Sequence, residues 1–202
     1  MFFIVRHGNT FDAVTPPRRI GARTDLPLTE AGVEQGSALG RYFAQRGIQF
    51  ARAFVSPLLR TRQTASAILE HQFDAPQIEE APFLKEIDHG PDENQTEDEV
   101  LQRIGNEALS AWDLKAEVPN GWIVEPEKRI KAWRALFAQG HDTSPILLVT
   151  SNGAARFALL ADGGLRKQAQ MLESLKLPTG GFGIIGRDAN GALSLREWGL
   201  RP

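Results

Sequence analysis

The stretch that decides the fold is Phe2-Phe3-Ile4-Val5-Arg6-His7-Gly8-Asn9-Thr10. Its first four residues form a short apolar run that is typical of a buried β-strand. Arg6 and His7 follow at the carboxyl end of this predicted strand, and ligands of open α/β sheets bind beyond such ends. An imidazole beside a permanent cation is an unusual choice for packing. It suits a nucleophile that attacks an anionic phosphoryl group.

The composition limits the classes of protein to which the chain can belong. With 202 residues, 42% of them hydrophobic, it can form one large domain with a sizeable core. A formal net charge of −2 argues against nucleic-acid and acidic-membrane partners. The absence of cysteine excludes disulfides, thiol catalysis and Cys-based zinc sites. The histidines are too scattered for a His-rich metal site: His7, His71, His89 and His141.

The N-terminus carries no sign of a targeting segment. No basic region with an apolar core and a cleavage site precedes the first predicted strand, which begins at residue 2. No apolar run approaches the roughly 20 residues that cross a bilayer. We therefore expect a cytoplasmic protein, and nothing in the sequence predicts its oligomeric state.

Predicted strands and helices alternate along the chain. Further strands are expected at residues 51–55, 77–80 and 145–150, and Asn190-Gly191 predicts a hairpin between 181–187 and 192–198. Helices are expected at residues 28–47, 56–70, 96–109, 127–138 and 154–161. This alternation predicts an α/β layered sandwich, and the terminal hairpin makes the sheet a mixed one.

Three of the helix starts carry capping signals. Thr29 is a candidate N-cap of the first helix, and Ser56 with Pro57 is typical of an N-cap followed by the first helical position. Thr96 and Glu99 form a capping box. Most of the acidic residues of 88–99 are expected to form a solvated loop and helix start, and residues 112–126 an ordered loop within a helical excursion.

Three predicted strands end in residues suited to binding an anion. They are followed by Arg6-His7-Gly8, by Ser56 with Arg60 in the first helical turn, and by Ser151-Asn152-Gly153. If these strands are parallel neighbours, their ends meet at one edge, where arginines and helix N-termini form a phosphate pocket. Glu86, in the block 83–90, is suited to protonating a leaving alkoxide. Each motif alone has an ordinary structural explanation, so the interpretation rests on their order and spacing.

These motifs resemble those of the histidine phosphatase superfamily. Residues 6–10 are similar to the signature at its nucleophilic histidine, and residues 25–32 to its Asp-x-Pro-Leu-Thr-x-x-Gly segment. Residues 56–65 are similar to its Ser-x-Leu-x-Arg-Ala-x-Gln-Thr-Ala helix, and residues 84–88 to the segment that holds its acid. The resemblance covers nearly the whole chain, with residues 100–140 the least distinctive. It implies a phosphoglycerate-mutase-like fold, a three-layer α/β/α sandwich with a mixed, mostly parallel sheet.

The resemblance also implies a function. It is that of a phosphomonoesterase that acts through a phosphohistidine intermediate on a small phosphorylated metabolite, without metal or organic cofactor. His7 is then the nucleophile and Glu86 the acid. The residues expected to bind the phosphate or the substrate are Arg6, Arg60, Asn152, Asn9, Thr10, Gly153 and His89. Arg62, two residues beyond Arg60, is expected to point elsewhere. We expect one domain over residues 1–202, with an excursion around 88–140 in the pocket wall.

Three departures from the family pattern bear on activity. Asn152 stands where the family usually has a second catalytic histidine, and Ala13 where it often has an asparagine. Asp92-Glu93-Asn94 stands where the family has Trp-Glu-Gly. Loss of one charge-assisted contact in the transition state costs about 2–4 kcal/mol, or two to three orders of magnitude in rate. A catalytically impaired phospho-ligand-binding protein therefore remains an alternative, and a phosphoglycerate mutase ranks below it. His89 is either a partial replacement for lost positive charge or an ordinary loop histidine.

Overall fold

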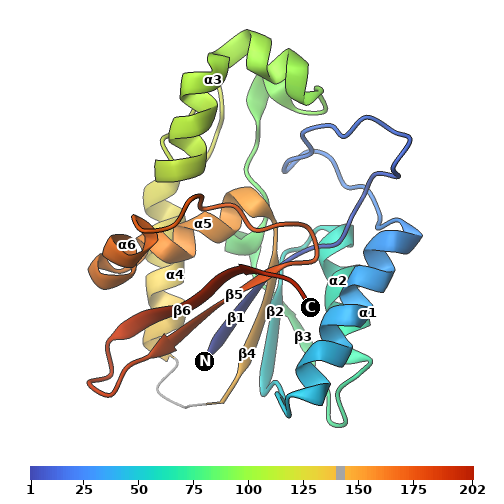
Figure 1. The fold of residues 1–202 in the computed structure, drawn as a ribbon, viewed down its shortest axis with the longest axis vertical. Helices are drawn as coiled ribbons and strands as arrows, with labels where there is room; N and C mark the ends of the chain where they lie inside the picture. Colours follow the sequence, from blue (N-terminus) through green and yellow to red (C-terminus); the bar gives the residue numbers. More distant parts are fainter. Residues whose placement is uncertain (140–143) are drawn as a thin grey trace.

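One mixed sheet forms the centre of the described part of the chain, residues 1–139 and 144–202 of a computed structural model (Figure 1). His141 lies outside the described residues. The strands follow the order β3-β2-β4-β1-β5-β6 across the sheet. Their bounds are β1 (Phe2–Arg6), β2 (Arg52–Val55), β3 (Ile78–Glu80), β4 (Ile146–Thr150), β5 (Phe182–Arg187) and β6 (Leu193–Leu200).

The apolar run that opens the sequence is the central strand β1. It pairs in parallel with β4, with Phe2 opposite Ile146, and antiparallel with β5. β2 pairs in parallel with both β4 and β3, whereas β6 pairs antiparallel with β5. This register confirms a mixed, mostly parallel sheet. It also brings the carboxyl ends of β1, β2 and β4 to the same edge.

Helices cover both faces of the sheet. α1 (Glu30–Gln45) and α2 (Leu59–Leu69) lie on one face, and α4 (Pro126–Gln139), α5 (Asn152–Leu160) and α6 (Gly163–Ala169) on the other (Figure 1). α3 (Glu97–Lys115) stands beyond the carboxyl ends of the strands, at the top of the view. Two 3₁₀ helices, η1 (Pro82–Leu84) and η2 (Gly90–Asp92), lead from β3 toward it.

Alternation along β1 divides the interior into two cores. Phe2 and Ile4 pack into the core beneath α4, α5 and α6, while Phe3 and Val5 pack into the core beneath α1 and α2. All four side chains are at most 2% exposed, as a strand covered on both faces requires. The three-layer α/β/α sandwich expected from the sequence is therefore confirmed. Within the described residues, no helix is long and apolar enough to cross a membrane.

The start of α2 differs from the sequence expectation. Ser56 is not its N-cap, because the Ser56 N–H still bonds to the Val149 carbonyl 3.0 Å away, as a continuation of the sheet. The helix begins at Leu59, and the N-cap Leu58 has no side chain that caps it. Instead, Asp25 accepts a hydrogen bond from the Leu59 N–H at 2.7 Å. A distant acidic residue therefore does what a local serine was predicted to do.

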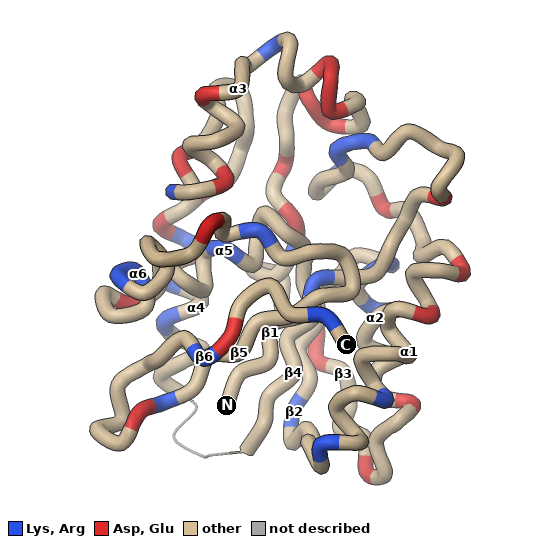
Figure 2. The backbone as a smooth tube through the Cα atoms, in the orientation of Figure 1, with Lys and Arg blue, Asp and Glu red and all other residues tan. Residues whose placement is uncertain are grey.

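The excursion after β3 also differs in detail. α3 continues to Lys115, so Trp112 belongs to the helix and only residues 116–125 form the expected loop. The Thr96–Glu99 capping box is confirmed, and a break at Gly105, with φ of 82°, divides the helix. Figure 2 shows the acidic run where α3 begins.

Glu97, Asp98 and Glu99 of the acidic segment 88–99 are exposed, as expected, but two of its acidic side chains are buried. Asp92 is 1% exposed and accepts hydrogen bonds from Arg103 and from Trp122 Nε1, the latter at 2.6 Å. The side chain of Glu93 is 7% exposed. These carboxylates are buried because donors from distant segments surround them.

The short helix α6 was not expected from the sequence. Gly163-Gly164 at its start argues against a helix, since glycine is a poor helix former. The Asp162 side chain nevertheless accepts hydrogen bonds from the N–H groups of Gly164 and Leu165 at 2.7 and 3.1 Å. This cap and the burial of Leu165 stabilise a short helix despite the glycines.

Candidate active site

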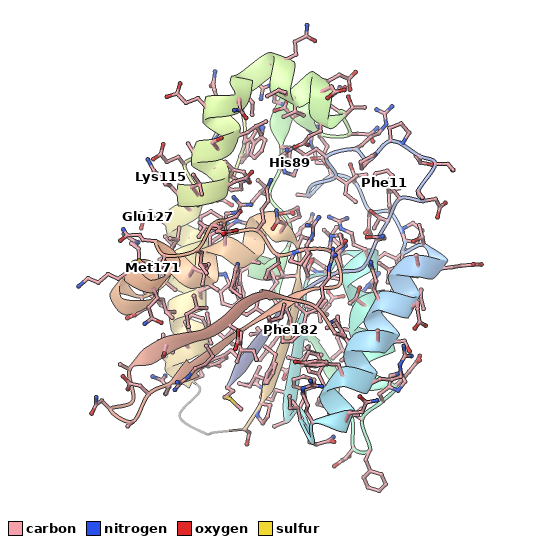
Figure 3. All side chains as sticks on the ribbon, in the orientation of Figure 1. Phe11, His89, Lys115, Glu127, Met171 and Phe182 are labelled. Carbon is pink, nitrogen blue, oxygen red and sulfur yellow. The ribbon has the colours of Figure 1, made fainter. Side chains whose placement is uncertain are left out.

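A cavity of about 560 Å³ lies at the carboxyl edge of the sheet, between the strand ends, the loop of residues 9–20 and α3. Figure 3 labels two of its lining residues, Phe11 in the N-terminal loop and His89 beneath α3. The predicted site residues that line it are Arg6, His7, Asn9, Thr10, Glu86, His89, Asn152 and Gly153. Segments far apart in the sequence are thus brought together at one place.

The His7 imidazole is buried and held at both ring nitrogens. Nε2 lies 3.2 Å from Arg60 Nε, and Nδ1 lies 2.8 Å from the Gly8 carbonyl oxygen. A guanidinium only donates, so Nε2 must accept with its lone pair, and the Nδ1 proton is donated to Gly8. Burial lowers the pKa of His7 well below its ordinary value, and the charges of Arg60 and Arg6 lower it further. At neutral pH the ring is therefore uncharged, with its lone pair on Nε2.

Arg60 is fully buried beside His7 and does not itself line the cavity. In addition to its contact with His7, it donates from Nη1 to the Thr24 carbonyl at 2.7 Å and from Nη2 to the Gly21 carbonyl at 3.2 Å. Burial lowers the pKa of Arg60, although the charge of Glu86 opposes this effect. The guanidinium is thus oriented by two backbone carbonyls, with its Nε directed at the nucleophile.

Arg6 is the second cation at the cavity. Its Nη1 donates to the Leu177 carbonyl at 2.8 Å, and its buried Nε has no partner among the described residues. Burial lowers the pKa of Arg6 to about 10, so the side chain remains charged at neutral pH. A buried donor without a partner is costly, and an anion in the cavity would satisfy it.

Leu177 also fixes the orientation of Asn152. The Leu177 N–H donates to Asn152 Oδ1 at 2.9 Å. Because the amide oxygen is used in this way, the amide nitrogen is left as a donor on a residue that lines the cavity. One backbone unit, Leu177, therefore holds both Arg6 and Asn152.

Glu86 provides a carboxylate in the same cavity. It is 5% exposed and accepts hydrogen bonds from the N–H groups of Ile87 at 2.9 Å and Gly153 at 3.1 Å. A side chain at Gly153 would place its Cβ 2.3 Å from Glu86 Oε1. Position 153 must therefore be glycine if the carboxylate is to stay where it is.

Two other residues named from the sequence are placed by the structure. Arg62 points away, as expected: its side chain pairs with Glu80 at 3.4 Å on the exposed face of α2. Ala13, which stands where the family often has an asparagine, is exposed in the loop that lines the cavity.

Sequence reasoning missed Arg156. It is fully buried, stacks 3.9 Å over the ring of Trp112, and donates from Nη1 to the Trp112 carbonyl. Its Nη2 has no partner among the described residues, and burial lowers its pKa to about 10. The sequence feature that could have identified Arg156 is its position one helical turn after Asn152.

Paired charges on the outer wall were also missed. Arg19 pairs with Glu97, and Lys176 Nζ lies 2.6 Å from Asp113 Oδ2; all four residues line the cavity. Because they come from three segments of the chain, no local motif marks them as neighbours.

A curated relative matches part of the chain. Over 97 residues, or 47% of this chain, the sequence is 35% identical to 46% of a 2,3-bisphosphoglycerate-dependent phosphoglycerate mutase from Methylobacterium sp. (strain 4-46). The chain spans about half the length of the first curated relatives that it matches.

Solved structures match over nearly the full length. The alpha-ribazole phosphatase from Shigella flexneri gives a TM-score of 0.72 at 22% identity, covering 99% of this chain and 96% of that one. The mycobacterial glucosyl-3-phosphoglycerate phosphatase gives 0.74 at 19% identity, covering 100% and 99%. At such identities the likeness shows the fold alone. Residues 2–199 match the family described as histidine phosphatase superfamily (branch 1). This chain therefore belongs to the histidine phosphatase superfamily.

Proposed function

We propose that this protein hydrolyses a phosphomonoester of a small metabolite through a phosphohistidine on His7 Nε2. The observation that carries the proposal is the buried, uncharged His7 imidazole, whose Nε2 lone pair lies beside Arg60 at a cavity also lined by Arg6 and Glu86. An unprotonated imidazole nitrogen is a nucleophile, and the two arginines offset the charge of a phosphoryl group.

In the first step, the His7 Nε2 lone pair forms a bond to phosphorus while the bond between phosphorus and the ester oxygen breaks. Arg60 Nε exchanges its contact with Nε2 for one with a phosphoryl oxygen. The unpartnered Arg6 Nε binds a second oxygen, and the Asn152 amide nitrogen donates to the same group. Glu86 is the acid that gives a proton to the leaving alkoxide.

In the second step, the Glu86 carboxylate removes a proton from water, which attacks the phosphohistidine. The bond between Nε2 and phosphorus breaks, inorganic phosphate leaves, and the lone pair returns to His7. The arginines neutralise the phosphoryl charge, so the proposed reaction uses no metal or organic cofactor.

We assign substrate selection to the wall of the cavity that lies outside the strand ends. His89, Glu97, Trp112 and Asp113 line it, and all four come from the excursion around residues 88–140. We propose that residues 1–202 form a single domain that holds the whole site. We also propose that the protein is cytoplasmic.

Two observations support other functions. Asn152 and Ala13 replace residues that the family uses at the phosphate, which favours a protein that binds a phosphorylated ligand with negligible turnover. The curated mutase relatives favour phosphoryl transfer between positions of one molecule.

One experiment separates these functions. The protein is mixed with p-nitrophenyl phosphate or 3-phosphoglycerate, quenched rapidly in alkali, in which phosphohistidine is stable, and analysed by mass spectrometry. We expect a phosphorylated peptide containing His7, release of inorganic phosphate, and loss of both in His7→Gln. Retention of activity by His7→Gln would contradict the mechanism. Binding without a phosphoenzyme would indicate the binding protein, and formation of 2-phosphoglycerate the mutase.

A further inference from the structure

Glu93 is a buried carboxylate that the proposed mechanism does not use. Its Oε1 accepts hydrogen bonds from the Gly21 N–H at 2.9 Å, the Arg23 N–H at 3.2 Å and Thr24 Oγ1 at 2.7 Å. Its Oε2 accepts from the His89 N–H at 3.3 Å. Both oxygens are therefore used, and three of the four donors belong to one short segment, residues 21–24.

The same segment holds Arg60 on its other side. The carbonyl oxygens of Gly21 and Thr24 accept from the Arg60 guanidinium at 3.2 and 2.7 Å. The Ala22 N–H, between the two that Glu93 binds, donates to the Ile87 carbonyl at 2.8 Å. Successive N–H groups of residues 21–23 are thus fixed by residues 87–93, while carbonyls of the same segment face the cation.

Gly21 shows how closely the two segments approach each other. A Cβ at this position would lie 2.4 Å from Glu93 Oε2, 2.5 Å from the Ile87 carbonyl oxygen and 2.6 Å from His89 Nδ1. All three distances are shorter than any side chain tolerates. Glycine is therefore required for the contact with Glu93, independently of the hydrogen bonds.

Glu93 also acts on Arg60 through its charge. The carboxylate raises the pKa of Arg60, against the effect of burial. Burial raises the pKa of Glu93 itself, but the His89 imidazole, 3.7 Å away, and hydrogen bonds from Thr24 and Gly21 outweigh it and bring the pKa to about 2. The carboxylate is therefore ionised at every pH at which a folded enzyme works.

We propose that Glu93 is a positioning residue for the nucleophile: it fixes the backbone of residues 21–24, whose carbonyl oxygens hold the Arg60 guanidinium against the His7 imidazole. The proposal deepens the proposed function and rests on it for its effect on catalysis. Removal of Glu93 leaves the donors of Gly21 and Arg23 without their acceptor, so the segment shifts and Arg60 with it. A displacement of about 1 Å in such a site costs roughly 100-fold in rate.

The experiment that tests this proposal measures the protonation of His7. The charged groups that face its ring are Arg60 from α2, Arg6 from β1 and Glu86, and Arg60 is the larger of the two cationic contributions that lower the pKa of His7. We would measure the ¹⁵N titration and tautomer of His7 by NMR in the wild type, Glu93→Gln and Glu93→Ala, with His7→Gln for assignment. If Arg60 moves away, the pKa of His7 rises, because a nearby cation disfavours imidazolium.

Two further variants provide a weaker perturbation of Glu93 and a control. Thr24→Val removes one hydrogen bond to Glu93 at nearly constant volume, so it should shift His7 in the same direction by less, and it serves if the Glu93 variants do not fold. Glu99→Gln is the control: its carboxylate belongs to the same excursion but bonds to Thr96 at the start of α3. It should leave the His7 signal unchanged.

Activity on p-nitrophenyl phosphate is measured in parallel, and kcat/KM should fall roughly 10- to 100-fold in the Glu93 variants. An unshifted His7 signal in folded Glu93→Ala, which removes the acceptor oxygens altogether, would overturn the positioning role, whatever the activity. A His7 signal that shifts in the Glu93 variants, together with a wild type that shows no phosphatase activity, would support that role while overturning the proposed function, so the two failures are distinguishable.

Discussion

Asn152 separates this site from the two-histidine arrangement that the family resemblance implies. Its amide oxygen accepts from the Leu177 N–H, and its amide nitrogen is left to donate into the cavity. An amide supplies one neutral hydrogen bond to a phosphoryl oxygen, whereas an imidazolium supplies a charged one, which is about twice as strong.

Asn152→His is therefore expected to raise kcat on p-nitrophenyl phosphate by roughly 10- to 100-fold. As an imidazolium, the new side chain donates from Nε2 to the substrate and no longer accepts the Leu177 N–H. Asn152→Leu, which has a similar volume and no donor, should lower kcat and is the matched comparison. Equal rates in all three proteins would mean that this position does not limit catalysis.

Gly153 controls the place of the proposed acid. In Gly153→Ala the Cβ would lie 2.3 Å from Glu86 Oε1, so the carboxylate must move. We expect kcat to fall by roughly 100-fold, the usual contribution of a general acid. Gly163→Ala is the control, since a Cβ there meets nothing within 4 Å. A Gly153→Ala enzyme as active as the wild type would contradict the role of Glu86.

Among the helices, α2 depends on a cap that comes from outside its own sequence. Asp25 accepts from the Leu59 N–H at 2.7 Å and so satisfies one of the free donors at the helix start. Asp25→Ala should lower the free energy of unfolding by about 1 kcal/mol, measured by urea denaturation. Asp25→Asn retains an acceptor oxygen and should recover most of the loss. A wild-type value for Asp25→Ala would show that the cap contributes nothing.

For the whole molecule, the buried Glu93 carboxylate contributes to how stability depends on pH. The pKa of Glu93 is about 2 in the folded protein, against an ordinary value of 4.5. A depressed folded pKa stabilises the protein above pH 4.5, and this stabilisation is lost as the pH falls from 4.5 toward 2.

Urea unfolding of the wild type and Glu93→Gln tests this dependence. The difference in unfolding free energy between them should be largest at pH 7 and at least halve at pH 3, because the unfolded wild type then carries a protonated Glu93. A difference that does not vary with pH would mean that the charge of Glu93 does not stabilise the fold.

Local patterns were sufficient for most of the elements. The apolar run at residues 2–5, the Thr96–Glu99 capping box and the Asn190-Gly191 turn each act over a few residues, so the sequence predicts them correctly. The start of α2 and the short α6 were not predicted. In the first case, continued pairing with β4 and the distant Asp25 override the local signal; in the second, the Asp162 cap and burial of Leu165 do.

By itself, the sequence predicted most of the strands and helices, and it predicted that Arg6, His7 and Asn152 meet at one edge if their strands are parallel neighbours, a condition that the tertiary structure fulfils. These follow from periodicity and from motifs at strand ends, which are properties of short stretches. Only the tertiary structure decided how His7 is held: which nitrogen keeps the lone pair, that Arg60 is hidden behind it, and that Glu93 holds the loop around that arginine. Those contacts join residues tens of positions apart, and each depends on the angles and burial that packing alone creates.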